Sequence, residues 1–443
     1  MNTSRLAPLR FDALMAELDE QFSIVTDKRA QERVQYSICD TLKSAFAMFS
    51  LKCPSLLNFR ERTRIEDGNL QRVYRIGKIP GDTQMRATLD EVPPSASEYS
   101  FAEIFAHLHS SEILSDYRFE AAENSLIISV DGVEHFSSTA IHCPCCTVKS
   151  HRDGTTSSSH SALCAVVVAP GKSEVFPLDI EPILQHDGSE KNDCERNAAK
   201  RLLARLGERY ASEALLFVED ALYANAPHIR QILEISPRWR YLLAVKPTSH
   251  KSLFARFDAL KRHRPERFAS HRYTDADGTE YLFEYANDMA LSESASDVRV
   301  HILRCSVTPS KGKNKGKTTV FTYVTNINLR RSNVYGLMKA GRARWKIENE
   351  TFNTLKNQGY HFEHNYGHGN KYLASLLASV MLLAFLVDQV QAAADVVFRK
   401  IVATLATKAK FWESLRAVFK TRSFRSMDDA LYTIADLYKI QLE

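Results

Sequence analysis

The strongest constraint on the fold lies in the middle of the chain, where short apolar runs alternate with helical patterns. The strand-like runs are residues 125–132, 163–170, 173–183, 215–223 and 241–246. Two helical patterns, over 194–210 and after Pro227, separate the last three of these runs. The order β-β-β-α-β-α-β is typical of a mixed sheet with helices on its faces. We therefore predict an α/β core.

Different patterns flank this core. Apolar residues at Phe11, Leu14, Leu18 and Phe22 recur at helical spacing, which predicts a helical N-terminal part that either packs or binds a DNA end. Three further strand-like pieces with polar turns predict a β-rich insertion before the core resumes. The boundaries we expect are 1–120 (helical), 121–246 (first core part), 247–330 (insertion), 331–393 (core completion) and 394–443 (helical C-terminal part).

Composition narrows the class of protein. The 443 residues carry 58 Lys and Arg against 53 Asp and Glu, so a surface for nucleic acid must be local. A hydrophobic fraction of 44% and only eight Cys exclude a disordered chain and a disulfide scaffold. The most apolar stretch, 372–387, is shorter than the roughly 20 residues of a membrane span, so we predict a buried helix and no membrane contact. The charged start has no secretory pattern, which predicts a cytoplasmic protein.

Three carboxylates occupy positions that suit a metal site. Asp131 and Asp220 each follow an apolar run, and Glu348 lies in a helical pattern further along the chain. Open α/β sheets place their sites at strand ends. Carboxylate oxygens are the ligands that Mg²⁺ prefers, and two such ions can support phosphoryl transfer. These residues therefore predict a Mg²⁺ (or Mn²⁺) site for that chemistry.

Several motifs resemble those of a known family. They are SLLNF (55–59), IPGDTQMR (79–86), SVDGVEHFSS (129–138), HCPCC (142–146), DGSEKNDCERNAAKR (187–201), EDALYANAPH (219–228) and RWKIENETFNTLKNQGYHFEHNYGHG (344–369). The chain resembles, from about residue 10 to 390, bacterial insertion-sequence transposases of the DDE type. That resemblance implies a ribonuclease H-like mixed sheet flanked by helices, interrupted by an insertion.

The resemblance also implies roles for particular residues. Asp131, Asp220 and Glu348 match the catalytic, metal-binding triad, and Arg344 matches a phosphate contact. Lys356 is a further expected phosphate contact, although it lies eight rather than seven residues after Glu348. The family's Tyr on this helix is replaced by Gly341, and Glu350 is a second candidate for the catalytic Glu.

The activity implied is Mg²⁺-dependent cleavage at the ends of an insertion element and joining of the 3′-OH ends to target DNA. The expected partners are double-stranded DNA, both terminal inverted repeats and target, and a second copy of the chain when two ends are paired. The expected location is the bacterial cytoplasm, on the nucleoid. Two alternatives remain, a metal-dependent DNA nuclease and a catalytically dead DNA-binding regulator derived from a transposase.

A Cys/His group predicts a second, different metal. Cys143 and Cys146 form a C-x-x-C pair, and His160 follows. Thiolates and imidazoles are the ligands of structural Zn²⁺. We predict zinc on these three, with His151 or Cys164 as the fourth ligand; the alternative is a set of reduced, partly buried thiols.

Two more segments are ambiguous in function. Four lysines in a Gly-containing stretch favour either contacts to DNA phosphates or a solvated turn; they are Lys311, Lys313, Lys315 and Lys317. Three histidines after the predicted catalytic helix are candidates for contact with a DNA end, or ordinary loop residues; they are His361, His364 and His368.

Overall fold

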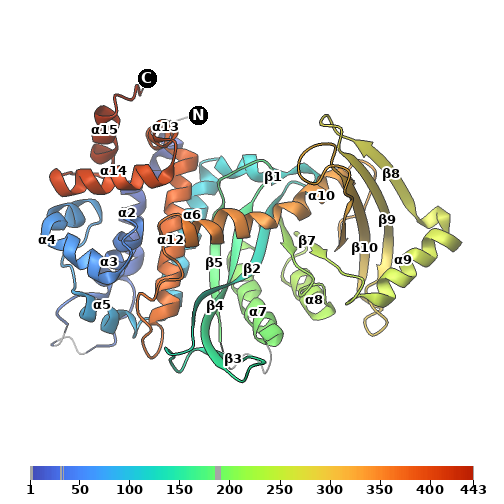
Figure 1. Ribbon diagram of the computed structural model, residues 1–443, viewed down its shortest axis with the longest axis horizontal. Helices are drawn as coiled ribbons and strands as arrows, with labels where there is room; N and C mark the ends of the chain where they lie inside the picture. Colours follow the sequence, from blue (N-terminus) through green and yellow to red (C-terminus); the bar gives the residue numbers. More distant parts are fainter. Residues whose placement is uncertain (1–2, 30–31, 33, 185–190, 443) are drawn as a thin grey trace.

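A computed structural model describes residues 3–29, 32, 34–184 and 191–442, so residues 187–190 of the motif at 187–201 lie outside it. A long mixed sheet forms the centre of the molecule (Figure 1). Its strands, in spatial order, are β3 (Thr147–Ser150), β4 (Thr156–Val168), β2 (Ser125–Ser138), β6 (Leu215–Glu219), β7 (Trp239–Ala244), β11 (Thr319–Thr325), β10 (Arg299–Thr308), β9 (Glu280–Ala290) and β8 (Ala269–Thr274). Two more strands pair beside this path, β1 (Arg118–Phe119) with β2 and β5 (Phe176–Ile183) with β4.

The core of the sheet has the order β5-β4-β2-β6-β7. Strands β2, β4 and β5 are antiparallel neighbours, whereas β6 and β7 run parallel to β2. Parallel pairs need crossover connections, and helices α7 (Lys191–Tyr210) and α8 (Ala226–Ile235) supply them. This topology is that of a ribonuclease H-like core, and it confirms the predicted α/β fold class.

The strands of the insertion extend the core sheet rather than forming a separate one. Strand β11 pairs antiparallel with β7, with Tyr323 opposite Ala244. Strands β10, β9 and β8 follow outward, and helix α9 (Lys251–His263) packs beside β9. The insertion and the core therefore form one continuous sheet from β3 to β8. Loops of the insertion can then lie beside the strand ends of the core.

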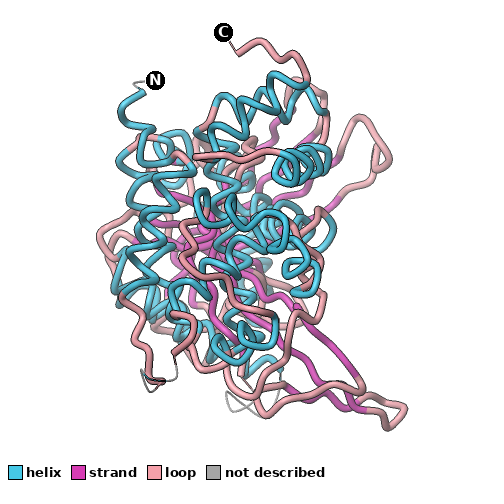
Figure 2. Tube along the Cα trace, turned by 90° about the vertical axis from the view of Figure 1, so that its left-hand side faces the viewer, coloured by secondary structure: helices cyan, strands magenta, loops and turns pink. Residues whose placement is uncertain are grey.

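Helices of the N-terminal and C-terminal parts of the chain lie together at the end of the molecule opposite β8 (Figures 1 and 2). Those of the N-terminal part are α1 (Thr3–Leu6), η1 (Ala7–Leu9), α2 (Phe11–Ser23), α3 (Ile38–Ser50), α4 (Leu56–Val73), α5 (Asp82–Leu89), η3 (Pro94–Ser97), α6 (Glu98–Ser110), η4 (Ile113–Tyr117) and η5 (Glu120–Ala122). Figure 2, seen from this end, shows helices in front of the strands. The face of α2 that the sequence predicts to be apolar is buried.

Helix α12 (Leu373–Ala394) is the central helix of this group. By length and composition it passes as a membrane span, but 89% of its most apolar window is buried inside the protein. It packs against α3 and β5, so the predicted buried helix is confirmed. The chain ends with α13 (Val396–Leu405), α14 (Lys408–Thr421) and α15 (Met427–Leu437).

A buried ion pair joins three distant segments in this region. The Nζ of Lys52, just after α3, lies 2.6 Å from Oδ2 of Asp388 on α12. The Tyr360 hydroxyl donates to the same oxygen. Lys52 Nζ also lies 3.9 Å from the ring centre of Trp412 on α14. Burial lowers the pKa of Lys52 to about 8, although the Asp388 carboxylate opposes that shift. Lys52 Nζ also donates to the carbonyls of Phe49 and Ser50, so this buried charge is held by hydrogen bonds as well as by the ion pair.

Candidate functional site

Two of the predicted carboxylates come from neighbouring parallel strands, one within β2 and one directly after β6. Ser129 of β2 pairs with Val218 of β6 in parallel register. Asp131 lies two residues further along β2, and Asp220 directly follows Glu219, the last residue of β6, so both carboxylates belong to the same end of this strand pair. The sequence reading of Asp131 as a strand-end residue was wrong, because β2 continues beside β4 to Ser138 while β6 stops.

The third carboxylate comes from a helix that crosses this face. Helix α10 (Val334–Ala343) leads into a π-helical turn, η8 (Ile347–Phe352), followed by α11 (Asn353–Asn357). The Ser129 hydroxyl donates a 3.1 Å hydrogen bond to the carbonyl of Arg344, which fixes the segment on β2. Wide π turns are frequent at functional sites, and this one carries Glu348.

Arg344 connects two of the three carboxylates. Its Nη1 lies 2.7 Å from Asp131 Oδ2, and its Nη2 lies 3.1 Å from Glu348 Oε1. The Arg344 and Asp131 side chains are only 13% and 19% exposed, so screening by water is limited. The bridge joins Glu348, not Glu350, to Asp131, and this geometry favours Glu348 as the third member.

The environment of the Asp131 side chain disfavours the charged form of its carboxyl group. Burial raises the pKa of Asp131 to about 7, with the Arg344 guanidinium opposing the shift and the Glu348 carboxylate adding to it. Two carboxylates close together repel unless a cation lies between them. A donor set made of carboxylate oxygens fits Mg²⁺ or Mn²⁺. Asp131, Asp220 and Glu348 would hold such ions.

The loop that carries Asp220 is held by a pair that sequence reasoning missed. Glu219 is buried at the end of β6, and its Oε2 lies 2.6 Å from Nε2 of His228 at the start of α8. Asp220 itself accepts a 2.8 Å hydrogen bond from the amide of Leu222. Both contacts restrain the turn after β6 and hence the Asp220 side chain. The signal in the sequence was the dipeptide Glu219-Asp220. The strand pattern alone does not indicate that Glu219 pairs with a histidine.

The Gly at 341 has a steric explanation. A Cβ at this position would lie 2.6 Å from the ring of Tyr323 on β11. The ring of a strand residue therefore occupies the space into which a side chain on the helix would project. This departure from the family pattern lets α10 approach the sheet closely.

The basic residues predicted to contact DNA lie in two places. Lys356 Nζ is 2.6 Å from Glu363 Oε1, so it is ion-paired in this structure. The four lysines from Lys311 to Lys317 are exposed in the loop between β10 and β11. Because β11 runs antiparallel to β7, this loop leaves the sheet at the edge where β6 ends and Asp220 lies. Lys311 lies 3.6 Å from Asp277 of the neighbouring turn.

A Cys/His cluster lies further along the β2–β4 hairpin. The ligand atoms of Cys143, Cys146, His160 and His368 are all within 4.8 Å of one another. The sequence placed the first three together, and the structure does the same. The expected fourth member was wrong: His151 is exposed and hydrogen-bonds Ser157, and Cys164 is buried within β4. A loop histidine, His368, takes that place instead.

Comparisons with known proteins find several solved structures that are similar to this chain. No family model matches the chain, and no curated protein matches it. The chain is similar to a piggyBac transposase in a synaptic complex with hairpin DNA, with 12% identity over 95% of this chain and 80% of that one, at a TM-score of 0.38.

Proposed function

We propose that this chain is a DNA transposase of the DDE type. The observation that carries the proposal is the site at the end of β6. Asp131 lies on β2 and Asp220 directly follows the parallel neighbour β6, and Arg344 is ion-paired with both Asp131 and Glu348. A triad of carboxylates on a ribonuclease H-like sheet suits metal-assisted phosphoryl transfer on a nucleic acid backbone.

The protein's contribution is to position charge. Two Mg²⁺ or Mn²⁺ ions, when bound, would activate the attacking oxygen and stabilise the leaving one. Asp131 and Asp220 are fixed by the sheet and the restrained turn, while Ser129 holds the helix of Glu348 in place. The guanidinium of Arg344 has the fork geometry that binds phosphate oxygens, so it can orient the scissile phosphate beside the triad.

The proposed reaction is hydrolysis at each end of an insertion element, followed by attack of the freed 3′-OH on target DNA. The substrates are duplexes carrying terminal inverted repeats, and pairing of two ends implies two copies of the chain. Strand transfer distinguishes this activity from that of a nuclease, which cuts without joining. A dead regulator would bind the ends and do neither.

The test is a strand-transfer assay on the DNA that flanks the gene. A labelled duplex carrying the flanking repeat, incubated with the protein, Mg²⁺ and a circular target, should yield cut ends and joined products. Cut ends without joined products would support the nuclease, and binding without cutting would support the regulator. A duplex with a scrambled repeat is the control.

The basic loop yields a prediction about salt. Each DNA phosphate that a lysine neutralises contributes about 0.9 to the slope of log K against log salt. Changing Lys311, Lys313, Lys315 and Lys317 to Ala should therefore flatten that slope by about 3 units, since Lys311 is already near Asp277. Flexible lysines contact the backbone rather than bases, so repeat and scrambled duplexes should weaken alike.

A matched variant controls for damage to the loop. Changing the same four lysines to Arg keeps the charge, so the salt slope should stay close to that of the unmodified protein. If the Ala variant keeps the original slope on both duplexes, the loop is a solvated turn and makes no contact with DNA.

A further inference from the structure

The four side chains of the Cys/His cluster lie close enough together to surround one metal ion. The Cys143 and Cys146 sulfurs are 3.7 Å apart, and His160 Nε2 lies 3.3 and 3.5 Å from them. His368 Nε2 lies 3.0 Å from Cys146 Sγ. Zinc–sulfur and zinc–nitrogen bonds of about 2.3 and 2.1 Å in a tetrahedron would put S···S at roughly 3.8 Å and S···N at roughly 3.6 Å.

The chemistry of the donors selects the metal. Two thiolates and two imidazoles are the typical set for structural Zn²⁺, whereas Mg²⁺ takes oxygen ligands. Four protein ligands leave no open position for a substrate or water, so the site is structural rather than catalytic. His160 lies opposite Phe136 on β2, five residues past Asp131. This is roughly 16 Å along the strand from the carboxylate site.

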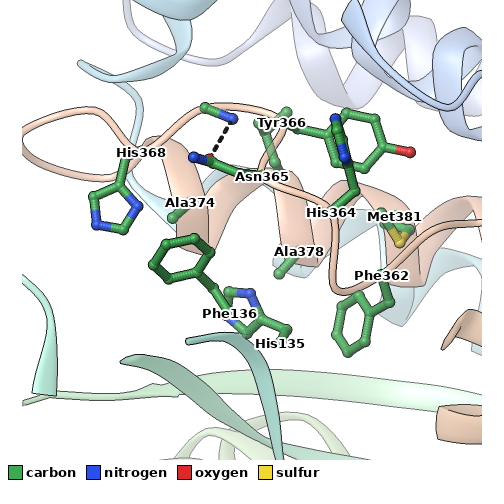
Figure 3. Close-up of a pocket in the computed structure, with 12 residues that line it drawn as sticks. His135, Phe136, Phe362, His364, Asn365, Tyr366, His368, Ala374, Ala378 and Met381 are labelled. Atoms are coloured by element: carbon green, nitrogen blue, oxygen red, sulfur yellow. Dashed lines mark hydrogen bonds between the residues drawn. The ribbon is translucent and has the colours of Figure 1, made fainter. Parts of the chain in front are cut away.

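The fourth ligand comes from a segment far along the chain. His368 lies in the loop between α11 and α12, twenty residues after Glu348. This loop folds back over β2, where Phe362 packs against His135 and the His368 ring against Phe136. Figure 3 shows these rings together beside α12. The Asp90 carboxylate accepts hydrogen bonds from the backbone amides of residues 370–373. These bonds hold the end of the loop.

We infer that the chain binds one structural Zn²⁺ through Cys143, Cys146, His160 and His368. The ion clamps the loop that follows the Glu348 helix to the β2–β4 hairpin that carries Asp131. Zinc binding by itself does not depend on the proposed function. The effect of the clamp on cleavage does rest on it, since the clamp joins the segments that carry two of the three carboxylates.

The first test is the metal content of the full chain made with zinc supplied. We expect about one Zn²⁺ per chain. Cys146→Ser and His368→Ala should lose most of it, and the melting temperature should fall by at least about 5 °C, because a structural metal contributes folding energy. Cys145→Ser and His151→Ala are matched controls from the same segment, and both should keep the zinc.

Cobalt exchange separates ligation from simple unfolding. The Co²⁺ form should show tetrahedral visible bands with thiolate charge transfer. His368→Cys supplies a third thiolate, so it should retain the metal and strengthen that band by roughly half. Absence of zinc from the unmodified protein would overturn the site. Retention of zinc and an unchanged cobalt spectrum in His368→Ala would overturn the fourth ligand. Zinc lost with cleavage unaffected would overturn only the clamp's role in the reaction.

Discussion

Asp131→Asn, Asp220→Asn and Glu348→Gln are each expected to abolish cleavage of an end-repeat duplex in Mg²⁺. Each change removes a metal ligand while keeping the size of the side chain. A bound metal supplies several kcal/mol of transition-state stabilisation, so the rate should fall by at least about a thousandfold, the equivalent of roughly 4 kcal/mol. Binding of the uncut duplex should stay within about threefold, because most of that affinity comes from phosphate contacts elsewhere. Gel-based cleavage and binding assays measure both.

Two observations keep this result from being confused with misfolding. Asp131→Asn removes one of the two carboxylates paired with Arg344, so the fold of each metal-free variant is checked by its circular dichroism spectrum and melting curve. Glu350→Gln is the matched control on the same helical turn, and it should cut normally. Normal cutting by Glu348→Gln together with loss of cutting by Glu350→Gln would move the catalytic role to Glu350.

Patterns within single elements made the core predictable. Continuous apolar runs identified β2, β4, β5, β6 and β7 in chain order, because strands buried on both faces read as uninterrupted apolar segments. The helices between them were identified from apolar residues that recur every 3.6 residues. The C-x-x-C pair and His160 were also found, since the hairpin between β2 and β4 keeps them close in sequence. These features could be predicted because each depends only on residues close together in the sequence.

Features that depend on packing between distant segments were not predictable. His368 joins Cys146 from 222 residues away, and nothing in its own loop distinguishes it from His361 or His364. The continuity of the insertion with the core sheet is likewise decided by the pairing of β11 with β7. Strand patterns give burial but not partners, so the sequence suggested a separate β-rich unit.

Lys52→Met is expected to destabilise the fold strongly, although it lies outside the site. It would leave Asp388 buried without its cationic partner, and breaking a buried pair from one side costs about 3–5 kcal/mol. Asp388 is nearly enclosed, with 9% of its side chain exposed, and the Tyr360 hydroxyl also donates a hydrogen bond to it. Melting curves or urea denaturation of the full chain measure the loss. Lys410→Met, at an exposed position on α14, is the control and should change stability by less than about 0.5 kcal/mol.

The double variant Lys52→Met, Asp388→Leu tests the cause of that loss. Replacing a buried ion pair by apolar side chains of similar volume is often neutral or stabilising, because neither charge then has to be taken out of water. The double variant should therefore regain most of the stability that Lys52→Met alone loses. A double variant as unstable as the single one would mean that Lys52 acts mainly through its contacts with the rings of Tyr360 and Trp412. In that case these packing contacts, rather than the charge pair, join α3, α12 and α14.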